Sequence, residues 1–346
     1  MKGIVGKLSL MILTLLPLNM WGQDSSCTLG EQLFQGHQWS DAVVAFGQCE
    51  HQNPGKTDAL LYRGKSLVNL QKYREAAIDL QTYANSHPHS DDAAYLLAFI
   101  AFREDKPRES LQLFTDAAKL KPPLANDLMI IALDYVLLKD YSDAARYLES
   151  SLKMNPEDPE AHYHLGRVRY QQNQFDLAIA AFQEAIKRDP TSVKAYDNLG
   201  LSFEAKNENE PAIAAYRKAL ELDRAGTLHS EQPYLNLGSL LARSNRLSDA
   251  IPLLTRAGEI APGEFKVRYE LAKAYFEAQQ FDSARQQAEQ AVKLDPSDGP
   301  SHYLLGRVYQ RLNLKDLASE QFRLTASLIH DKNASQRGMA SGMNSR

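Results

Sequence analysis

Small and bulky side chains recur along the chain with a period of 34 residues. Counted in units of this length from Gln23, with four residues inserted after the sixth unit, position 8 is always Gly or Ala: Gly30, Gly64, Ala98, Ala132, Gly166, Gly200, Gly238, Ala272 and Gly306. Position 20 is Ala in every unit except the third, which has Ser110. A fixed period of this length is typical of stacked supersecondary units, so the pattern predicts a chain built from repeats.

Within each unit, the two small positions lie twelve residues apart, as expected where two antiparallel helices touch most closely. Position 24 is bulky in every unit but the eighth: Phe46, Leu80, Phe114, Leu148, Phe182, Tyr216, Leu254 and Phe322. We expect these side chains to fill the space beside the close contact. Asp or Ser follows a short turn, as in Gln174-Phe175-Asp176, and is predicted to cap the second helix. Proline then recurs at position 32, where the helix cannot continue.

These residues carry a resemblance to a known family. His164-Leu165-Gly166, Asn198-Leu199-Gly200 and Asn236-Leu237-Gly238, together with the Ala-Ile segments at 178–182, 212–216 and 250–254, resemble the tetratricopeptide repeat. The resemblance implies an all-α, right-handed superhelical solenoid of nine helix-turn-helix repeats over residues 23–332. The expected repeats are 23–56, 57–90, 91–124, 125–158, 159–192, 193–226, 231–264, 265–298 and 299–332.

The two ends of the chain differ from the repeats. Lys2 and Lys7 precede an apolar run over residues 8–18, which predicts a secretory signal peptide over residues 1–22; an uncleaved anchor is the alternative. We therefore expect a periplasmic or extracellular protein without a stable membrane span after cleavage. At the other end, the last helix is expected over 317–330 with Asp316 as its N-cap, followed by a disordered tail over 333–346.

Export would place two cysteines, Cys27 and Cys49, in an oxidising compartment, where a disulfide is permitted. They lie at positions 5 and 27 of the first unit, about one helical turn away from the register of the small-residue contact. Position 27 is also small in most other units, so Cys49 is equally well read as a small core residue. Both interpretations stay open.

The charge balance disfavours a nucleic-acid partner. Without the two lysines of the leader, the chain holds 37 basic and 43 acidic residues. A backbone-phosphate binder is normally basic. The composition, 44% hydrophobic and 24% charged, is that of an ordinary soluble protein.

No motif assembles an active site, so we expect no enzyme activity, cofactor or metal. Gly55-Lys56-Thr57 ends like a phosphate loop, but Glu50 stands where that motif needs glycine. His87 and His89 flank a proline in a loop, and His162 and His164 are two residues apart on a helix, where side chains point apart.

The resemblance implies that positions 2, 5, 9, 12 and 13 of each unit face a concave groove. Units one and two place mostly acidic residues there, including Glu31 and Asp58. Units three and four place apolar residues there: Tyr95, Phe99, Phe102, Met129, Leu133, Val136 and Leu137. Units five, eight and nine combine aromatic and basic residues: Tyr163, Arg167, Tyr170, Tyr269, Lys273, Phe276, Tyr303, Arg307 and Arg311.

Two functions fit such a groove. The first is a non-enzymatic scaffold that binds a protein or peptide partner through clustered apolar anchors. The second is a carbohydrate-binding or polysaccharide-export accessory, for which aromatic ring faces and basic donors are suited. The non-functional alternatives are that the apolar residues of units three and four belong to the core, and that the basic and aromatic residues of units five, eight and nine form an ordinary solvated surface. The fixed Lys, Asn and Arg set of carboxylate-clamp repeats is not found.

Overall fold

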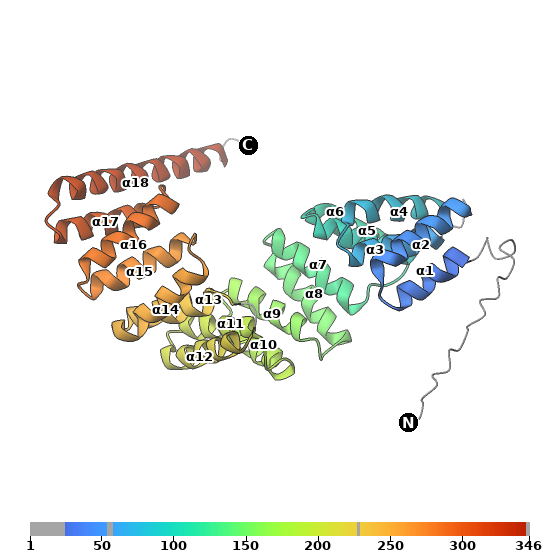
Figure 1. Ribbon diagram of the computed structural model, residues 1–346, viewed down its shortest axis with the longest axis horizontal. Coiled ribbons are helices and arrows are strands. Elements are labelled where there is room, and N and C mark those ends of the chain that lie inside the picture. Colours follow the sequence, from blue (N-terminus) through green and yellow to red (C-terminus); the bar gives the residue numbers. More distant parts are fainter. Residues whose placement is uncertain (1–24, 54–57, 227–228, 344–346) are drawn as a thin grey trace, which may run out of the picture. The chain divides into compact units, whose positions relative to one another are not determined.

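The computed structural model describes residues 25–53, 58–226 and 229–343, which fold into helices and connecting turns with no strand in these ranges. Residues 1–22, where we expect the signal peptide, lie outside them. The chain forms two compact units, Met1–Met154 (the N-terminal unit) and Asn155–Arg346 (the C-terminal unit). The helices are labelled in Figure 1.

The N-terminal unit contains α1 (Ser25–Gln35), α2 (Trp39–Gln52), α3 (Asp58–Asn69), α4 (Tyr73–Ser86), α5 (Asp91–Arg103), α6 (Pro107–Ala117), α7 (Ala125–Leu137) and α8 (Tyr141–Met154). The C-terminal unit contains α9 (Pro159–Gln171), α10 (Phe175–Arg188), α11 (Val193–Ala205), α12 (Asn209–Ala225), α13 (Gln232–Arg243), α14 (Leu247–Ile260), α15 (Phe265–Glu277), α16 (Phe281–Leu294), α17 (Gly299–Arg311) and α18 (Lys315–Met343). Consecutive helices pair into hairpins, and within each unit the first helices of neighbouring hairpins also touch. We call the surface that these first helices share the first-helix face.

Each first helix ends in a left-handed residue at position 15 of its unit. The residues with positive φ are His37, Gln71, Asp105, Lys139, Asn173, Asn207, Asn245, Gln279 and Asn313, with φ between 56° and 64°. At Lys139 the backbone N–H donates to the Val136 carbonyl, and the next N–H, of Asp140, donates to Tyr135. This is the Schellman arrangement, which satisfies the last carbonyls of the helix and turns the chain back.

The predicted N-caps of the second helices are wrong by about two residues. α10 begins at Phe175, so the N-cap is Gln174, which makes no side-chain capping bond, and Asp176 lies inside the first turn. Likewise α18 begins at Lys315, with Asp316 in its first turn. These carboxylates instead lie near the positive end of the helix dipole, where a negative charge stabilises the helix. Side-chain capping occurs at some first helices, where Ser90 and Asp158 accept bonds from backbone N–H groups, and at the second helix α8, where Asp140 accepts from the Asp143 N–H.

The close contact between the two helices of a hairpin lies where the small residues predict it. In the third hairpin, the Ser110 hydroxyl at position 20 donates to the Ala98 carbonyl at position 8, over 3.0 Å. A Cβ atom placed on Gly166 would come within 2.7 Å of the Phe182 ring at position 24. The glycine thus leaves room for the bulky side chain of the facing helix.

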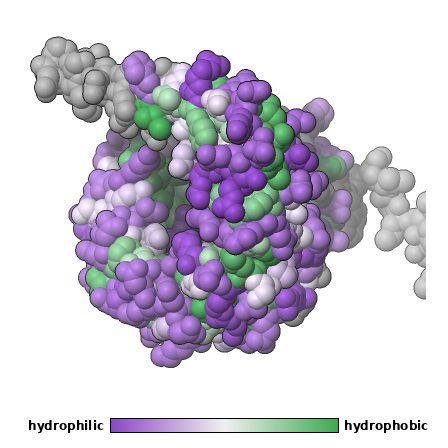
Figure 2. All heavy atoms as spheres, turned by 90° about the vertical axis from the view of Figure 1, so that its left-hand side faces the viewer, coloured by the Kyte–Doolittle hydropathy of each residue, from purple (hydrophilic) through white to green (hydrophobic). Residues whose placement is uncertain are grey.

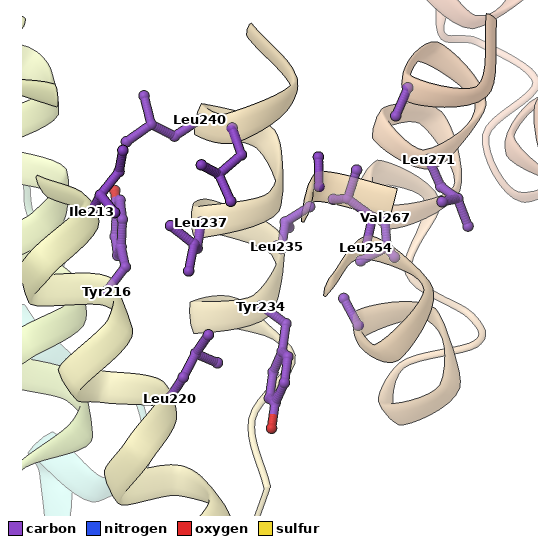
Figure 3. Close-up of a cluster of buried hydrophobic side chains, with 14 of the residues drawn as sticks. Ile213, Tyr216, Leu220, Tyr234, Leu235, Leu237, Leu240, Leu254, Val267 and Leu271 are labelled. Carbon is purple, nitrogen blue, oxygen red and sulfur yellow. The ribbon is translucent and has the colours of Figure 1, made fainter. Parts of the chain in front are cut away.

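The hydrophobic core continues from one hairpin into the next. Figure 3 shows α13 between α12 on one side and α14 with α15 on the other. Leu237 and Leu240 face Ile213 and Tyr216 of α12, whereas Leu235 lies toward α14 and α15. The hairpins around α13 therefore bury surface against their neighbours, as in a solenoid.

In three units the side chain at position 4 bonds to the turn before its own helix. His162 and His302 each place Nε2 at 2.9 and 3.0 Å from the carbonyl of the proline that ends the preceding unit, Pro156 and Pro296. Arg268 donates to the corresponding Pro262 carbonyl over 3.2 Å. The recurring histidines thus hold the start of the first helix against the turn that precedes it.

The first hairpin is closed by a disulfide. Cys27 of α1 and Cys49 of α2 are bonded, with their Cα atoms 4.9 Å apart. Both residues are buried and pack with Ala42 and Phe46 in the core of that hairpin. The offset of one turn does not separate the cysteines, because the helices remain within disulfide reach on either side of their closest contact.

The C-terminal tail differs from the expectation. α18 continues to Met343, so residues 333–343, expected to be disordered, are helical. The sequence beyond His330 contains no proline and several good helix formers, including Ala334, Gln336 and Arg337. Within the described ranges, no helix is both long and apolar enough to cross a membrane.

Candidate partner-binding surfaces

The apolar residues predicted for the groove in repeats three and four are neither fully buried nor fully exposed. Tyr95, Phe99 and Phe102 pack against a buried cluster around Phe114 and Ile130 and remain half-buried. Met129, Leu133 and Val136 of α7 are half-buried too, and Leu137 is 48% exposed. The set therefore contributes to the core with one side and to the first-helix face with the other.

A cavity of about 320 Å³ opens on the first-helix face of the N-terminal unit. We call it the N-terminal pocket. Its apolar lining comes from α1, α3, α5 and the segment before α7: Phe34, Val68, Tyr95, Leu96, Pro122 and Leu124. The Tyr95 hydroxyl donates to the Lys121 carbonyl over 2.6 Å and so fixes the ring against the pocket wall. Leu124 is 59% exposed and lies at the mouth.

Ion pairs rim the N-terminal pocket. Lys65 of α3 lies 2.5 Å from Asp92, and Lys121 lies 2.8 Å from Asp91. The Lys121 ammonium lowers the pKa of Asp91, which therefore stays ionised at neutral pH. Asp127 accepts a bond from the Leu124 backbone N–H over 2.8 Å and holds the start of α7. The pocket thus combines an apolar floor with oriented charges at its edge.

The basic and aromatic residues predicted in the C-terminal unit separate into two groups. Around α9 and α11, Tyr163 is only 9% exposed, and the Lys194 ammonium lies 4.6 Å from its ring centroid. Lys194 is already paired with Glu160 over 2.6 Å. Burial and the neighbouring Arg167 lower the pKa of His164 to about 4, so its imidazole is neutral at neutral pH. Tyr170 is half-buried, with its ring centroid 5.5 Å from that of Phe175.

The second group lies on α15 and α17. Arg307 stacks on Phe276 with its Cζ 4.4 Å from the ring centroid, and Arg311 stacks on Phe281 at 4.6 Å. Phe276 is buried, whereas Tyr303 is 52% exposed. The two other members, Tyr269 and Lys273, are half-buried. The molecular face shown in Figure 2 is mostly hydrophilic, with small separate hydrophobic areas.

One polar pair on the first-helix face was missed by sequence reasoning. Asp197 of α11 is only 6% exposed and accepts bonds from the Asn236 amide of α13 at 2.9 and 3.0 Å. Burial raises the pKa of Asp197 to about 6, an increase that the Asn236 bond opposes. Asp197 occupies position 5, where the other units carry Tyr, Leu, Met or Cys, and this charged departure was the available signal. The pair bridges adjacent hairpins and gives no sign of a reaction.

Asp134 of α7 is a second buried carboxylate. It is fully buried at position 10, where four other units place Ile100, Val168, Leu240 and Val308, and neither carboxylate oxygen makes a hydrogen bond. Burial raises the pKa of Asp134 to about 7, and the nearby Ser110 hydroxyl opposes the increase. The pKa of Asp134 is higher in the folded protein than the usual value of 3.8. The folded state is therefore most favoured at low pH, where Asp134 is protonated, and it loses this stabilisation as the pH rises through about 7.

We therefore expect Asp134→Leu to stabilise the protein at pH 8 by about 1–3 kcal/mol, because it removes a buried carboxylate without a partner. At pH 4, where Asp134 is protonated in the folded protein, the gain should shrink. Urea unfolding of both proteins at the two pH values measures the difference, and all other titrating groups cancel in the comparison. An equal gain at both pH values would contradict this account.

The described residues contain no group of three or more His, Cys, Asp or Glu side chains placed to hold a metal ion. His162 bonds to a backbone carbonyl, and His164 lies 3.8 Å from Glu160. Thr57 and its neighbours in the partial phosphate-loop motif, 54–57, lie outside the described residues.

Family models of the tetratricopeptide repeat match residues 58–90, 131–193, 165–228, 198–265 and 241–308. The chain is 24% identical to the BBSome complex member BBS4 of Bos taurus over 265 residues, 76% of this chain and 44% of that protein. It is 31% identical to anaphase-promoting complex subunit 3 of Dictyostelium discoideum over 101 residues, 29% of this chain and 10% of that protein. It thus spans less than half the length of either curated relative.

Two solved structures share the fold. The Cut9-Hcn1 hetero-tetramer of the APC/C aligns with a TM-score of 0.59 at 15% identity, over 84% of this chain and 57% of that one. PilW, a type IV pilus biogenesis factor, aligns with a TM-score of 0.53 at 21% identity, over 58% of this chain and 92% of that one. Together with the family matches, which cover more than half of the chain, they show that it belongs to the tetratricopeptide repeat family, an all-α scaffold fold typical of protein–protein interaction.

Proposed function

We propose that this protein is an exported, non-enzymatic scaffold that binds a segment of a protein partner on its first-helix face, with the N-terminal pocket as the main anchor site. The observation that carries the proposal is the pocket itself. Its apolar floor of Tyr95, Leu96 and Val68 is large enough for a bulky side chain, and fixed charges surround it. Apolar anchors in pockets with polar rims are the usual basis of peptide recognition.

Export is supported by two independent features. The sequence before residue 23 has the basic start and short apolar run of a signal peptide. Cys27 and Cys49 are bonded, and structural disulfides persist mainly in oxidising compartments. Fractionation followed by intact-mass measurement tests the proposal. Recovery of the protein from the cytoplasmic fraction, with a mass that still includes residues 1–22, would contradict export.

Peptide selection tests the binding function. We expect peptides selected from a random library on the wild-type protein to carry an aromatic or branched aliphatic anchor. Binding of these peptides should weaken at least about tenfold in Leu124→Glu, because a charge at the pocket mouth would oppose burial of an apolar side chain. Fluorescence anisotropy measures the affinity, and Leu177→Glu in α10 is the matched control, since Leu177 is 52% exposed and is not part of the pocket lining.

A carbohydrate-binding role is the second candidate, motivated by Tyr163, Tyr170, Tyr269, Phe276 and Tyr303. The structure buries Tyr163 and Phe276, so fewer ring faces are open for stacking on a sugar than the sequence indicates. Retention of the wild-type protein on a glycan array, with no peptide recovered from the selection, would favour this role over a protein-binding scaffold.

A further inference from the structure

Two arginines on the first-helix face of the C-terminal unit are held side by side by a pair of aromatic rings. Arg307 and Arg311 are one turn apart on α17 and both are exposed. Arg307 lies over Phe276 and Arg311 over Phe281, and these two rings contact each other edge to face with centroids 5.6 Å apart. The stacking restricts the guanidinium groups while their N–H edges stay accessible.

This arrangement is unusual for the protein. Several other arginines of the C-terminal unit have a carboxylate three or four residues away, as Arg188 has Glu184, Arg246 has Asp249 and Arg256 has Glu259. Arg307 and Arg311 instead have each other at this spacing, and like charges there destabilise a helix. Among the residues that the structure describes, no carboxylate forms an ion pair with either guanidinium.

An exposed aromatic ring and a third cation accompany Arg307 and Arg311. Tyr303, one turn before Arg307 on α17, is 52% exposed and its ring is held against Phe322 with centroids 5.8 Å apart. Lys273 of the neighbouring helix α15 adds a third cation on the same face. The result is a small basic surface with an aromatic edge on a chain whose net charge is −4. Its small extent and the acidic total disfavour a long polyanion such as nucleic acid.

We propose that Arg307 and Arg311, with Lys273, bind a pair of neighbouring carboxylates on an acidic segment of a protein partner. Guanidinium groups form bidentate hydrogen bonds with carboxylates, and two of them at one-turn spacing match two acidic side chains. Tyr303 provides a ring against which the segment packs. The inference rests on the proposed scaffold function. It concerns a separate site, in the C-terminal unit and not in the N-terminal unit that holds the pocket, and a different ligand chemistry.

The test uses the mature full-length chain and a fluorescein-labelled Gly/Ser peptide that carries a Glu-Glu pair, with the Gln-Gln peptide as its neutral counterpart. We expect saturable binding of the Glu-Glu peptide only. The double variant Arg307→Gln/Arg311→Gln should weaken binding at least about tenfold, because charge-assisted bonds are lost. Arg307→Lys/Arg311→Lys should weaken it less, since the charge remains but the bidentate geometry is lost.

Arg217→Gln/Arg323→Gln is the matched control. It removes the same charge from exposed positions on the second helices α12 and α18, and we expect it to leave peptide affinity nearly unchanged. An equal loss in both double variants, or equal binding of the Gln-Gln peptide, would overturn the inference. So would tighter binding of heparin than of the peptide with the same dependence on Arg307 and Arg311, because the site would then favour a polyanion.

Hydrogen exchange on the wild-type protein keeps the test independent of the folding of any variant. Protection confined to α15 and α17 on addition of the Glu-Glu peptide is expected, and protection elsewhere alone would contradict the site. A failure here leaves the scaffold function standing if selected apolar peptides still bind and depend on Leu124. Loss of both binding modes would count against the scaffold function itself.

Discussion

Replacing Gly200 by leucine is expected to destabilise the C-terminal unit by about 3 kcal/mol, at the upper end of the usual range for overpacking. A Cβ atom at this position would lie 2.5 Å from Cε1 and 2.6 Å from Cδ1 of Tyr216. Tyr216 is fully buried, and its hydroxyl donates to Glu204 over 3.0 Å, so the ring has no space into which it can move. The two helices α11 and α12 must therefore separate.

Gly263→Leu is the matched control for this substitution. Gly263 lies in the turn between α14 and α15, and no atom lies within 4 Å of a Cβ placed on it. Thermal unfolding followed by circular dichroism should show a clear drop in Tm for Gly200→Leu and almost none for Gly263→Leu. An unchanged Tm for Gly200→Leu would mean that position 8 does not mark the helix contact, and the alignment of the repeats would be wrong.

The contact at position 8 was predictable because close helix packing permits few side chains there. Size at positions 8, 20 and 24 is dictated by geometry and repeats in nearly every unit, so the sequence carries the signal many times. The turn at position 15 was not predictable in the same way. Its left-handed backbone is occupied by residues as different as His37, Asp105 and Lys139, none of them glycine. Asn, which tolerates this conformation better than most residues, occupies only four of the nine positions, so backbone hydrogen bonds must impose it elsewhere.

The candidate binding surfaces were predictable only in outline. The groove positions assigned by analogy include Tyr95, which lines the N-terminal pocket, and Arg307 and Arg311, which are exposed on α17. The same rule also selected Phe276, which is buried beneath Arg307, and Tyr163, which is nearly buried. Helical spacing indicates the direction of a side chain but not whether a neighbouring side chain covers it. The N-terminal pocket depends on the segment before α7, including Pro122 and Leu124, which groove positions alone do not include.

The disulfide is another feature that the positions of residues within the repeat could not decide. Positions 5 and 27 lie one turn from the closest contact, which on sequence grounds left the bond undecided. In the structure the Cα atoms of Cys27 and Cys49 are 4.9 Å apart. The first hairpin also has no preceding hairpin among the described residues to cover α1, and Leu29 is 47% exposed. A covalent link between α1 and α2 therefore has its greatest value at this end of the solenoid.

Breaking the bond should destabilise the first hairpin by about 3 kcal/mol, the loop-closure contribution expected for a ring of this size. Stability in a solenoid is roughly a sum over repeats and interfaces, so the loss should concentrate in α1 and α2 and fade toward α5. Hydrogen exchange with and without reductant measures this, with the α11 and α12 amides as the internal reference.

The variant Cys27→Ala/Cys49→Ala separates loss of the bond from other effects of the reductant. It should match the reduced wild-type protein in its α1 and α2 exchange and show no response to reductant. Thiol titration of denatured wild-type protein without reductant should detect no free thiol. Two reactive thiols in the protein recovered from its native compartment would mean that the bond does not form there, and the same result would remove one of the two supports for export.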